Sequence, residues 1–308
     1  MSDRILVTGA SGCIGTACVQ WLLQQGFDDL IGVTRSAASL PIRHIRGDIS
    51  DAAVIHRLVQ DIRPTRIIHL AGLQTPDCQA FPFAGLAVNV EGTNHLWRAA
   101  AELGSELRRV VFASSAAVYG PRSLYPGPAV REDDGLQPPN LYGHWKVAGE
   151  GATQALFMET GVSAVSLRLA TTYGPGRDRG LTSAPTSAMK AIVAGERFEM
   201  PYAGREHYHY VHDVGAAFAM AAVSDFAGYG VFNLRGRSLP TDEFVQKVRE
   251  VAAAEGLARG EITFLANPPK MPFVCDLDEA AICQQFPQMP LTELEAGIGA
   301  SLRHFASA

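Results

Sequence analysis

Short apolar runs alternate with longer helical patterns through the first 170 residues, and this alternation restricts the fold more than any other feature. The runs are rich in β-branched residues and lie at 5–9, 29–34, 42–47, 66–72, 109–115 and 165–171. Helical patterns at 13–26, 51–62 and 86–104 lie between them. Apolar strands separated by helices form a parallel sheet that is covered on both faces. We therefore expect an α/β fold, a doubly wound parallel sheet.

The alternation stops after Gly174. The following residues are rich in Gly, Pro and Arg before a helical pattern resumes, and another strand-like run lies at 231–236. We predict a nucleotide-binding core over 1–174, with strand contributions from about 205–236. Residues 175–308 are expected to form mainly a smaller, C-terminal substrate-binding lobe.

Composition limits the partners of this chain. Its 308 residues are 47% hydrophobic and carry a formal net charge of −5, so no general electrostatic attraction to nucleic acid or anionic membranes is expected. The five cysteines include no Cys-x-x-Cys pair, which argues against a zinc ribbon or a disulfide framework. No membrane-spanning run or signal peptide is seen, so we expect a cytoplasmic protein with no membrane partner.

The stretch "TGASGCIG" (8–15) places glycines three residues apart, between the first predicted strand and the first predicted helix. In a Rossmann fold such glycines allow a tight turn, backbone approach to a pyrophosphate and close packing of helix on strand. The free N–H groups of the helix then receive the phosphates. A tight turn without a ligand is the alternative. The predicted contacts are Gly9, Ser11, Gly12, Cys13, Ile14 and Gly15.

The second predicted strand ends in Thr34, Arg35 and Ser36, without the acidic residue that usually binds the ribose of NAD. Arg35 can pair with a 2′-phosphate, and the neighbouring hydroxyls add donors. A solvated arginine is the alternative. The pattern favours NADP over NAD as the cofactor.

Tyr142 and Lys146 lie four residues apart in a predicted helix, so both side chains face the same side. A free tyrosine has a pKa near 10, too high for a base at neutral pH. The Lys146 ammonium and a positive nicotinamide ring are expected to stabilise the phenolate and lower that pKa. Lys146 can also donate to the nicotinamide ribose. The pair predicts a proton-transfer site.

Several motifs occur together in one order: "HLAG" (69–72), "NVEGT" (89–93), "VVFASSAAVYG" (110–120), "YGHWKVAGE" (142–150) and "LRLATTYGPG" (167–176). Over residues 4–236 the chain thereby resembles the extended short-chain dehydrogenase/reductases, the NAD-dependent epimerase/dehydratase family. The resemblance implies that Ser115, Tyr142 and Lys146 are catalytic and that hydride passes between a substrate carbon and the nicotinamide. Further cofactor contacts are expected from Asp48, Ile49, Leu70, Ala71, Gly72, Asn89, Ser114 and Thr171.

Two departures from the family pattern bear on the reaction. Ala116 and Ala117 stand where dehydratases carry Asp-Glu, so dehydration is not expected. Thr171 replaces the asparagine of nucleotide-sugar epimerases, and Glu206, rather than Arg205, occupies a position usually held by arginine. Either Arg205 is shifted by one residue, or the contact with a diphosphate is missing. These differences favour a smaller polyol, such as a free sugar, aldonate or uronate. A UDP-sugar 4-epimerase with tightly bound NAD and a non-catalytic NADP-sensing regulator are the alternatives.

Substrate contacts are expected at the carboxyl ends of the strands and in the loop after Gly174. The candidates are Gln74, Cys78, Ala116, Thr172, Arg177, Arg179 and His209. For the two arginines a solvated loop is an equal alternative. His207 and His209 are expected on one strand face and His212 on the other, with no set of ligands that predicts a metal. The resemblance also implies a homodimer formed by the helices at 86–104 and 143–161.

Overall fold

The computed structural model describes residues 3–36 and 39–307. A seven-stranded parallel sheet forms its core, in the order β10-β6-β5-β4-β1-β2-β3. The strands are β1 (Ile5–Thr8), β2 (Leu30–Thr34), β3 (Arg43–Arg46), β4 (Arg66–His69), β5 (Arg109–Ser115), β6 (Ser163–Leu169) and β10 (Tyr229–Asn233). The doubly wound α/β sheet expected from the sequence is thereby confirmed.

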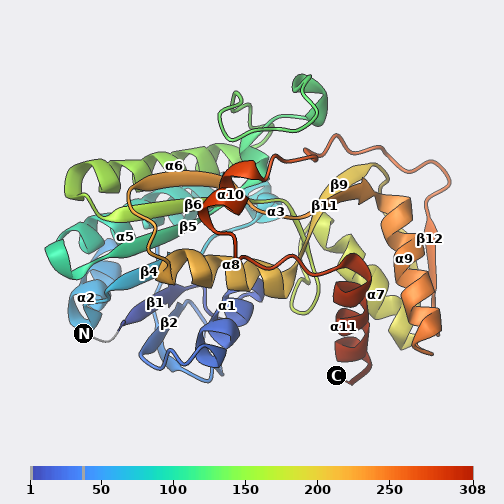
Figure 1. Ribbon diagram of the computed structural model, residues 1–308, viewed down its shortest axis with the longest axis horizontal. Helices are drawn as coiled ribbons and strands as arrows, with labels where there is room; N and C mark the ends of the chain where they lie inside the picture. The colour runs from blue at the N-terminus through green and yellow to red at the C-terminus, as the bar shows by residue number, and fades with distance from the viewer. Residues whose placement is uncertain (1–2, 37–38, 308) are drawn as a thin grey trace.

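Helices cover both faces of this sheet (Figure 1). On one face lie α1 (Cys13–Gln24) and α8 (Val211–Val223), and on the other lie α2 (Ala52–Ile62), α5 (Gly92–Ala101) and α6 (Leu141–Thr160). Alternate residues of each strand enter the two cores, as Val7 and Leu6 do in β1. Helices α1 and α8 pack closely, because a Cβ on Gly215 would lie 2.5 Å from the backbone of Ala17.

The second lobe has two small sheets. One contains β11 (Arg237–Pro240), β9 (Arg205–Tyr210) and β7 (Thr171–Tyr173), and the other pairs β12 (Glu261–Phe264) with β8 (Arg197–Met200). Helices α7 (Ala184–Ala194), α9 (Thr241–Ala254) and α11 (Leu294–Ser307) pack around an aromatic-rich core. Of the strands in 205–236, β10 extends the main sheet, whereas β9 pairs within the lobe. The strand contribution to the main sheet expected from 205–236 thus comes from β10.

The segment after β4 differs from the single helix expected at 86–104. It forms α3 (Thr75–Ala80), α4 (Pro82–Leu86), a π-helical turn at Ala87–Glu91 and then α5. The wider π turn points the Asn89 amide at the loop that follows β4, where it donates to Leu73 O and accepts from Leu73 N. Such turns are frequent at functional sites.

The remaining regular elements are short. They are α10 (Ala280–Gln285) and four 3₁₀ turns at Gly104–Glu106, Ala116–Val118, Arg122–Leu124 and Leu181–Ser183. Within the described residues, no helix combines the length and apolarity needed to cross a membrane.

Candidate active site

The glycine turn has the geometry of a phosphate cradle. Gly9 has φ +69°, and a Cβ there would lie 2.8 Å from the Ala71 nitrogen, while a Cβ on Gly15 would lie 2.2 Å from the Gly9 carbonyl. Gly12 differs, because its Cβ would meet only the Gly9 carbonyl, at 3.2 Å. No side chain caps the α1 N-terminus. The first N–H groups of α1 are therefore free for a phosphate, and the turn fits a dinucleotide.

A buried histidine connects this turn to the loop after β4. His69 lies between the hydroxyls of Thr8, at 2.7 Å, and Thr93, at 3.0 Å. Thr8 Oγ1 also accepts from the Ala71 N–H at 3.2 Å. Burial, together with the nearby Lys146 charge, lowers the pKa of His69 to about 3, so the ring is neutral. His69 thus fixes the loop that carries Leu70, Ala71 and Gly72. The sequence analysis assigned it no role.

Ser115, Tyr142 and Lys146 meet where β5 ends and α6 begins. Helix α6 can approach this closely because residue 143 is glycine: a Cβ there would lie 2.2 Å from the Ala117 carbonyl. Ser115 Oγ accepts from Ala117 N at 3.1 Å and donates to Leu169 O at 3.3 Å. Lys146 Nζ donates to Ala113 O at 2.6 Å and lies 5.5 Å from the centre of the Tyr142 ring.

The pKa of Tyr142 differs from the sequence expectation. Burial raises it, while the Ser115 hydroxyl and the Arg177 charge oppose the rise. Burial also lowers the pKa of Lys146 to about 8. The Lys146 ammonium is turned to the Ala113 carbonyl and does not reverse the effect of burial on Tyr142. The positive charge of a bound nicotinamide would add to the effects of Ser115 and Arg177 in favouring the phenolate.

Ser114 faces the protein rather than the cofactor site. Its hydroxyl donates to Glu150 of α6, and Glu150 forms a two-bond ion pair with Arg168 of β6, both bonds at 2.8 Å. Arg168 also donates to the Tyr119 hydroxyl at 2.6 Å. The Ser114 side chain therefore lies in this buried network, and the expected cofactor contact of Ser114 stays a prediction. The reason is the alternation along β5, which turns Ser114 and Ser115 to opposite faces.

The ends of β2 and β3 form the predicted adenosine end of the site. Thr34 Oγ1 donates to Ser36 O at 2.7 Å and bonds the His44 ring. Arg35 and Arg46 are both exposed, and Arg46 Nε donates to Arg35 O at 3.1 Å. Arg46 and His44 were not among the residues expected from the sequence. Only the register of β3 on β2 would have identified them, because it places Arg46 opposite Thr34.

The two residues expected at the adenine ring lie just beyond β3. Asp48 accepts from the backbone and hydroxyl of Ser50, whose bonds lower the pKa of the Asp48 carboxyl. Ile49 packs against Gly92 at the start of α5. The helix α2 is capped by Asp51, not by Asp48.

Several expected substrate residues gather near Tyr142. Arg177 donates to Gln74 Oε1 at 2.9 Å and to Thr182 Oγ1 at 2.7 Å, which joins the loop after β4 to the loop after β7. Cys78 is buried and accepts from Asn89 Nδ2 at 3.3 Å. Among the described residues the buried Thr172 hydroxyl has no partner. Ala116 is also buried and has no titratable group.

Two other expected substrate contacts, Arg179 and His209, do not lie in this group of residues. Arg179 is exposed and forms no side-chain bond with the described residues. His209 Nε2 accepts from Ala170 N at 2.9 Å, and its Nδ1 donates to Arg235 O at 2.7 Å. Both ring nitrogens are occupied by backbone groups, so the expected substrate contact of His209 is corrected to a structural role.

Two further histidines lie close to His209 in the sequence. The rings of His207 and His209 lie side by side in β9, with centres 4.9 Å apart, whereas His212 lies in α8 and not on the opposite face of the strand. Residues 3–36 and 39–307 contain no group of three His, Cys, Asp or Glu side chains placed to hold a metal ion.

Glu206 and Thr171 form a pair inside the second lobe. Thr171 Oγ1 donates to the Glu206 carboxyl at 2.6 Å, and the Tyr208 hydroxyl donates to it at 2.9 Å. Burial raises the pKa of Glu206, although these bonds oppose the rise. The Thr171 hydroxyl therefore donates to Glu206, and the cofactor contact expected from Thr171 stays a prediction.

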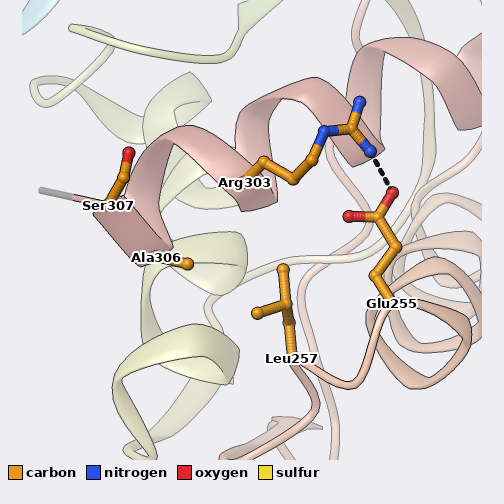
Figure 2. A pocket seen from close by; sticks show the side chains of 5 residues that line it. All are labelled: Glu255, Leu257, Arg303, Ala306 and Ser307. Carbon is orange, nitrogen blue, oxygen red and sulfur yellow. Dashed lines mark hydrogen bonds and ion pairs between the residues drawn. The ribbon is translucent and has the colours of Figure 1, made fainter.

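Figure 2 shows a separate, shallow pocket at the end of the C-terminal helix. It is lined by Glu255, Leu257, Arg303, Ala306 and Ser307, and an ion pair joins Arg303 to Glu255. None of these residues belongs to the group around Tyr142. The carboxyl ends of the main-sheet strands remain the candidate active site.

Known proteins share both the sequence pattern and the fold. Residues 5–234 match the model of the NAD dependent epimerase/dehydratase family. A UDP-glucose 4-epimerase from Azospirillum brasilense is 28% identical over 295 residues, 88% of this chain and 83% of that protein. A D-erythronate dehydrogenase from Cupriavidus necator is 28% identical over 270 residues, 81% of this chain and 82% of the other.

A solved structure agrees. The Thermus thermophilus UDP-glucose 4-epimerase in complex with NAD has a TM-score of 0.84 at 25% identity, with 99% of each chain covered. The glycine turn, Ser115, Tyr142 and Lys146 are thus found in a chain that matches these enzymes along its length. The chain belongs to the NAD dependent epimerase/dehydratase family and is an oxidoreductase enzyme of that family.

Proposed function

We propose that this enzyme transfers hydride at a secondary alcohol, or the corresponding ketone, of a free sugar or sugar acid. The observation that carries the proposal is the meeting of Ser115, Tyr142 and Lys146 beside an open glycine turn. A bound nicotinamide dinucleotide supplies the hydride acceptor or donor. The chain itself has to position the substrate oxygen and move one proton.

Each catalytic side chain has one task. The Ser115 hydroxyl holds the substrate oxygen, and the Tyr142 phenolate removes its proton as the carbon gives up hydride. Lys146, buried and held at Ala113 O, is one turn from Tyr142 and supplies positive charge to the site. In the reverse direction Tyr142 returns the proton to the ketone oxygen.

Net oxidation or reduction of a small substrate is favoured over nucleotide-sugar epimerisation. Glu206 stands at the sequence position where related epimerases usually have an arginine, and it is buried inside the second lobe, so no guanidinium is available at that position for a diphosphate. A UDP-sugar 4-epimerase remains the second candidate, because the chain is 28% identical to one over most of its length. A non-catalytic sensor would have no use for the three catalytic side chains.

Absorbance of the reduced nicotinamide distinguishes these functions. The enzyme is incubated with sugar acids, free sugars and UDP-sugars in the presence of NAD⁺ or NADP⁺. We expect reduced cofactor to accumulate with members of the first two groups. Product formed from a UDP-sugar without reduced cofactor would identify an epimerase instead. Tight cofactor binding without turnover of any compound would contradict both.

We further propose that NADP is the preferred cofactor. Arg35 and Arg46 present two guanidinium groups at the end of the β2–β3 pair. Replacing Arg35 or Arg46 by Ala is expected to weaken NADP⁺ binding roughly 10- to 100-fold, the effect of losing a charge-assisted bond, with NAD⁺ binding little changed. Fluorescence titration measures both constants. Arg43→Ala, at the other end of β3, is the control, and equal losses for both cofactors would contradict the assignment.

We also propose a cytoplasmic homodimer. The exposed apolar side chains include Phe83 on α4 and Met158 on α6, which are 84% and 76% exposed. Helices α5 and α6 are the surfaces expected to pair. Light scattering should give the mass of two subunits, and the mass of one subunit would contradict the proposal.

A further inference from the structure

Arg177 is a cation without a counter-ion beside the reacting groups. Within the described residues it forms no salt bridge, and its two hydrogen-bond partners, Gln74 and Thr182, are neutral. The neighbouring carboxylate of Asp178 is paired with Lys190 of α7 instead. The Arg177 charge is therefore left for a ligand.

The remaining donors of Arg177 have the arrangement that a carboxylate requires. A guanidinium has five N–H donors in a planar fork, and the two neutral partners account for one bond on each terminal nitrogen. Arg177 Nε is buried and has no partner among the described residues. Each terminal nitrogen keeps one N–H that these bonds do not use, and a carboxylate can accept from both.

The position of Arg177 relates it to the reaction. Its loop lies against the start of α1, where Cys13 Sγ contacts the Pro175 carbonyl at 3.6 Å. Its bond to Gln74 crosses to the loop after β4. Arg177 is also close enough to Tyr142 for its charge to lower the pKa of that hydroxyl. The cation therefore lies between the glycine turn and the proton-transfer group.

We infer that Arg177 binds the carboxylate of the substrate and that the enzyme acts on polyhydroxy monocarboxylic acids of the aldonate type. This inference rests on the proposed function, of which it specifies the substrate class. A monoanion matches the site, because a single cation is held there by an amide and a hydroxyl. A phosphate dianion would need a second cation, and Arg179 and Lys190 do not provide one: the first is exposed and the second is paired with Asp178.

The test compares acids with matched neutral compounds. Aldonates of four to six carbons, the corresponding alditols and the corresponding sugar phosphates are assayed with wild type, Arg177→Gln and Arg197→Gln. Arg197 is an exposed arginine of β8 that serves as the charge control. We expect wild type to prefer the acids. In Arg177→Gln we expect kcat/KM for acids to fall roughly 10- to 100-fold, mainly through KM.

Two further readouts separate a specific role from a structural one. In Arg177→Gln, the KM for the alditols and the binding of the cofactor should match wild type, since neither uses the carboxylate site. The loss of the Arg177 charge beside Tyr142 lowers kcat for acids and alditols alike, so the additional loss for acids reports the carboxylate site. An equal loss for acids and alditols would overturn the inference, and so would a loss of cofactor affinity, which would make Arg177 a phosphate contact. A preference for sugar phosphates would overturn it as well.

Calorimetry keeps this test independent of the proposed reaction. Cofactor-loaded wild type and Arg177→Gln are titrated with an aldonate. Binding to wild type alone would support the carboxylate site even if no compound is turned over, an outcome that would contradict only the proposed function. Equal binding to both proteins, or binding to neither, would overturn the inference while leaving sugar oxidation open.

Discussion

Replacing Tyr142 by Phe is expected to lower turnover by roughly 10²- to 10⁴-fold, the usual contribution of a positioned acid or base. The substitution removes one hydroxyl from a buried ring and leaves the glycine turn, Ser115 and Lys146 in place. Cofactor affinity should therefore remain within about twofold of wild type. Steady-state rates and fluorescence titration of the reduced cofactor measure the two quantities.

The control for this variant is Tyr229→Phe. Tyr229 lies in β10, where its ring stacks on Phe157 and its hydroxyl contacts the Glu150 carbonyl at 3.4 Å. It should retain wild-type turnover. If Tyr142→Phe retains it too, proton transfer belongs to another group and the assignment fails. A large loss of cofactor affinity would indicate that Tyr142 holds the cofactor.

Mild acid is expected to destabilise the enzyme strongly, because His69, His207 and His209 are buried as neutral rings. Burial lowers the pKa of His207 to about 4 and those of His69 and His209 to about 3. An unfolded chain takes up these protons near pH 6.5, and the folded one does not. The contribution of the three neutral rings to the free energy of unfolding is therefore fully present above pH 6.5 and is lost as the pH falls toward 4. At pH 5 each buried ring lowers the free energy of unfolding by about 2 kcal/mol relative to neutral pH.

Urea unfolding at pH 7.5, 6.5, 5.5 and 5.0 measures this loss. Three such rings remove about 6 kcal/mol by pH 5, which is most of the stability of an ordinary domain. In His209→Gln the slope of unfolding free energy against pH should correspond to one proton fewer, whatever the stability at pH 7.5. His304, which is exposed, is the control. An unchanged free energy of unfolding between pH 7.5 and 5.0 would contradict the prediction.

The sequence predicts those parts of the fold and site that depend on neighbouring residues. Strand β5 follows from an apolar run, the glycine turn from its spacing, and the common face of Tyr142 and Lys146 from the helical repeat. The π turn around Asn89 could not be predicted this way, because no local pattern in residues 87–91 distinguishes a π turn from an α-helix. It is stabilised by bonds to Leu73, which is 16 residues away.

The other differences between the sequence predictions and the structure arise from contacts between residues that are distant in the sequence. His209 is occupied by Ala170 and Arg235, which only the packing of the second lobe brings together. Arg46 reaches Arg35 through the register of β3 on β2, and no local pattern states that register. The orientation of Ser114, by contrast, could have been predicted from the sequence, because side chains alternate along β5 and Ser114 must face the side opposite Ser115.

The spacing of functional residues along α6 limits how an enzyme of this kind can acquire new substrates. Tyr142, Lys146 and Glu150 recur every fourth residue along it, so the proton-transfer group and the buried partner of Arg168 share one rigid face. A shift of this helix that altered the chemistry would also break the ion pair that anchors it. New substrates are therefore acquired most easily through the loops that carry Gln74 and Arg177, while the helix stays constant.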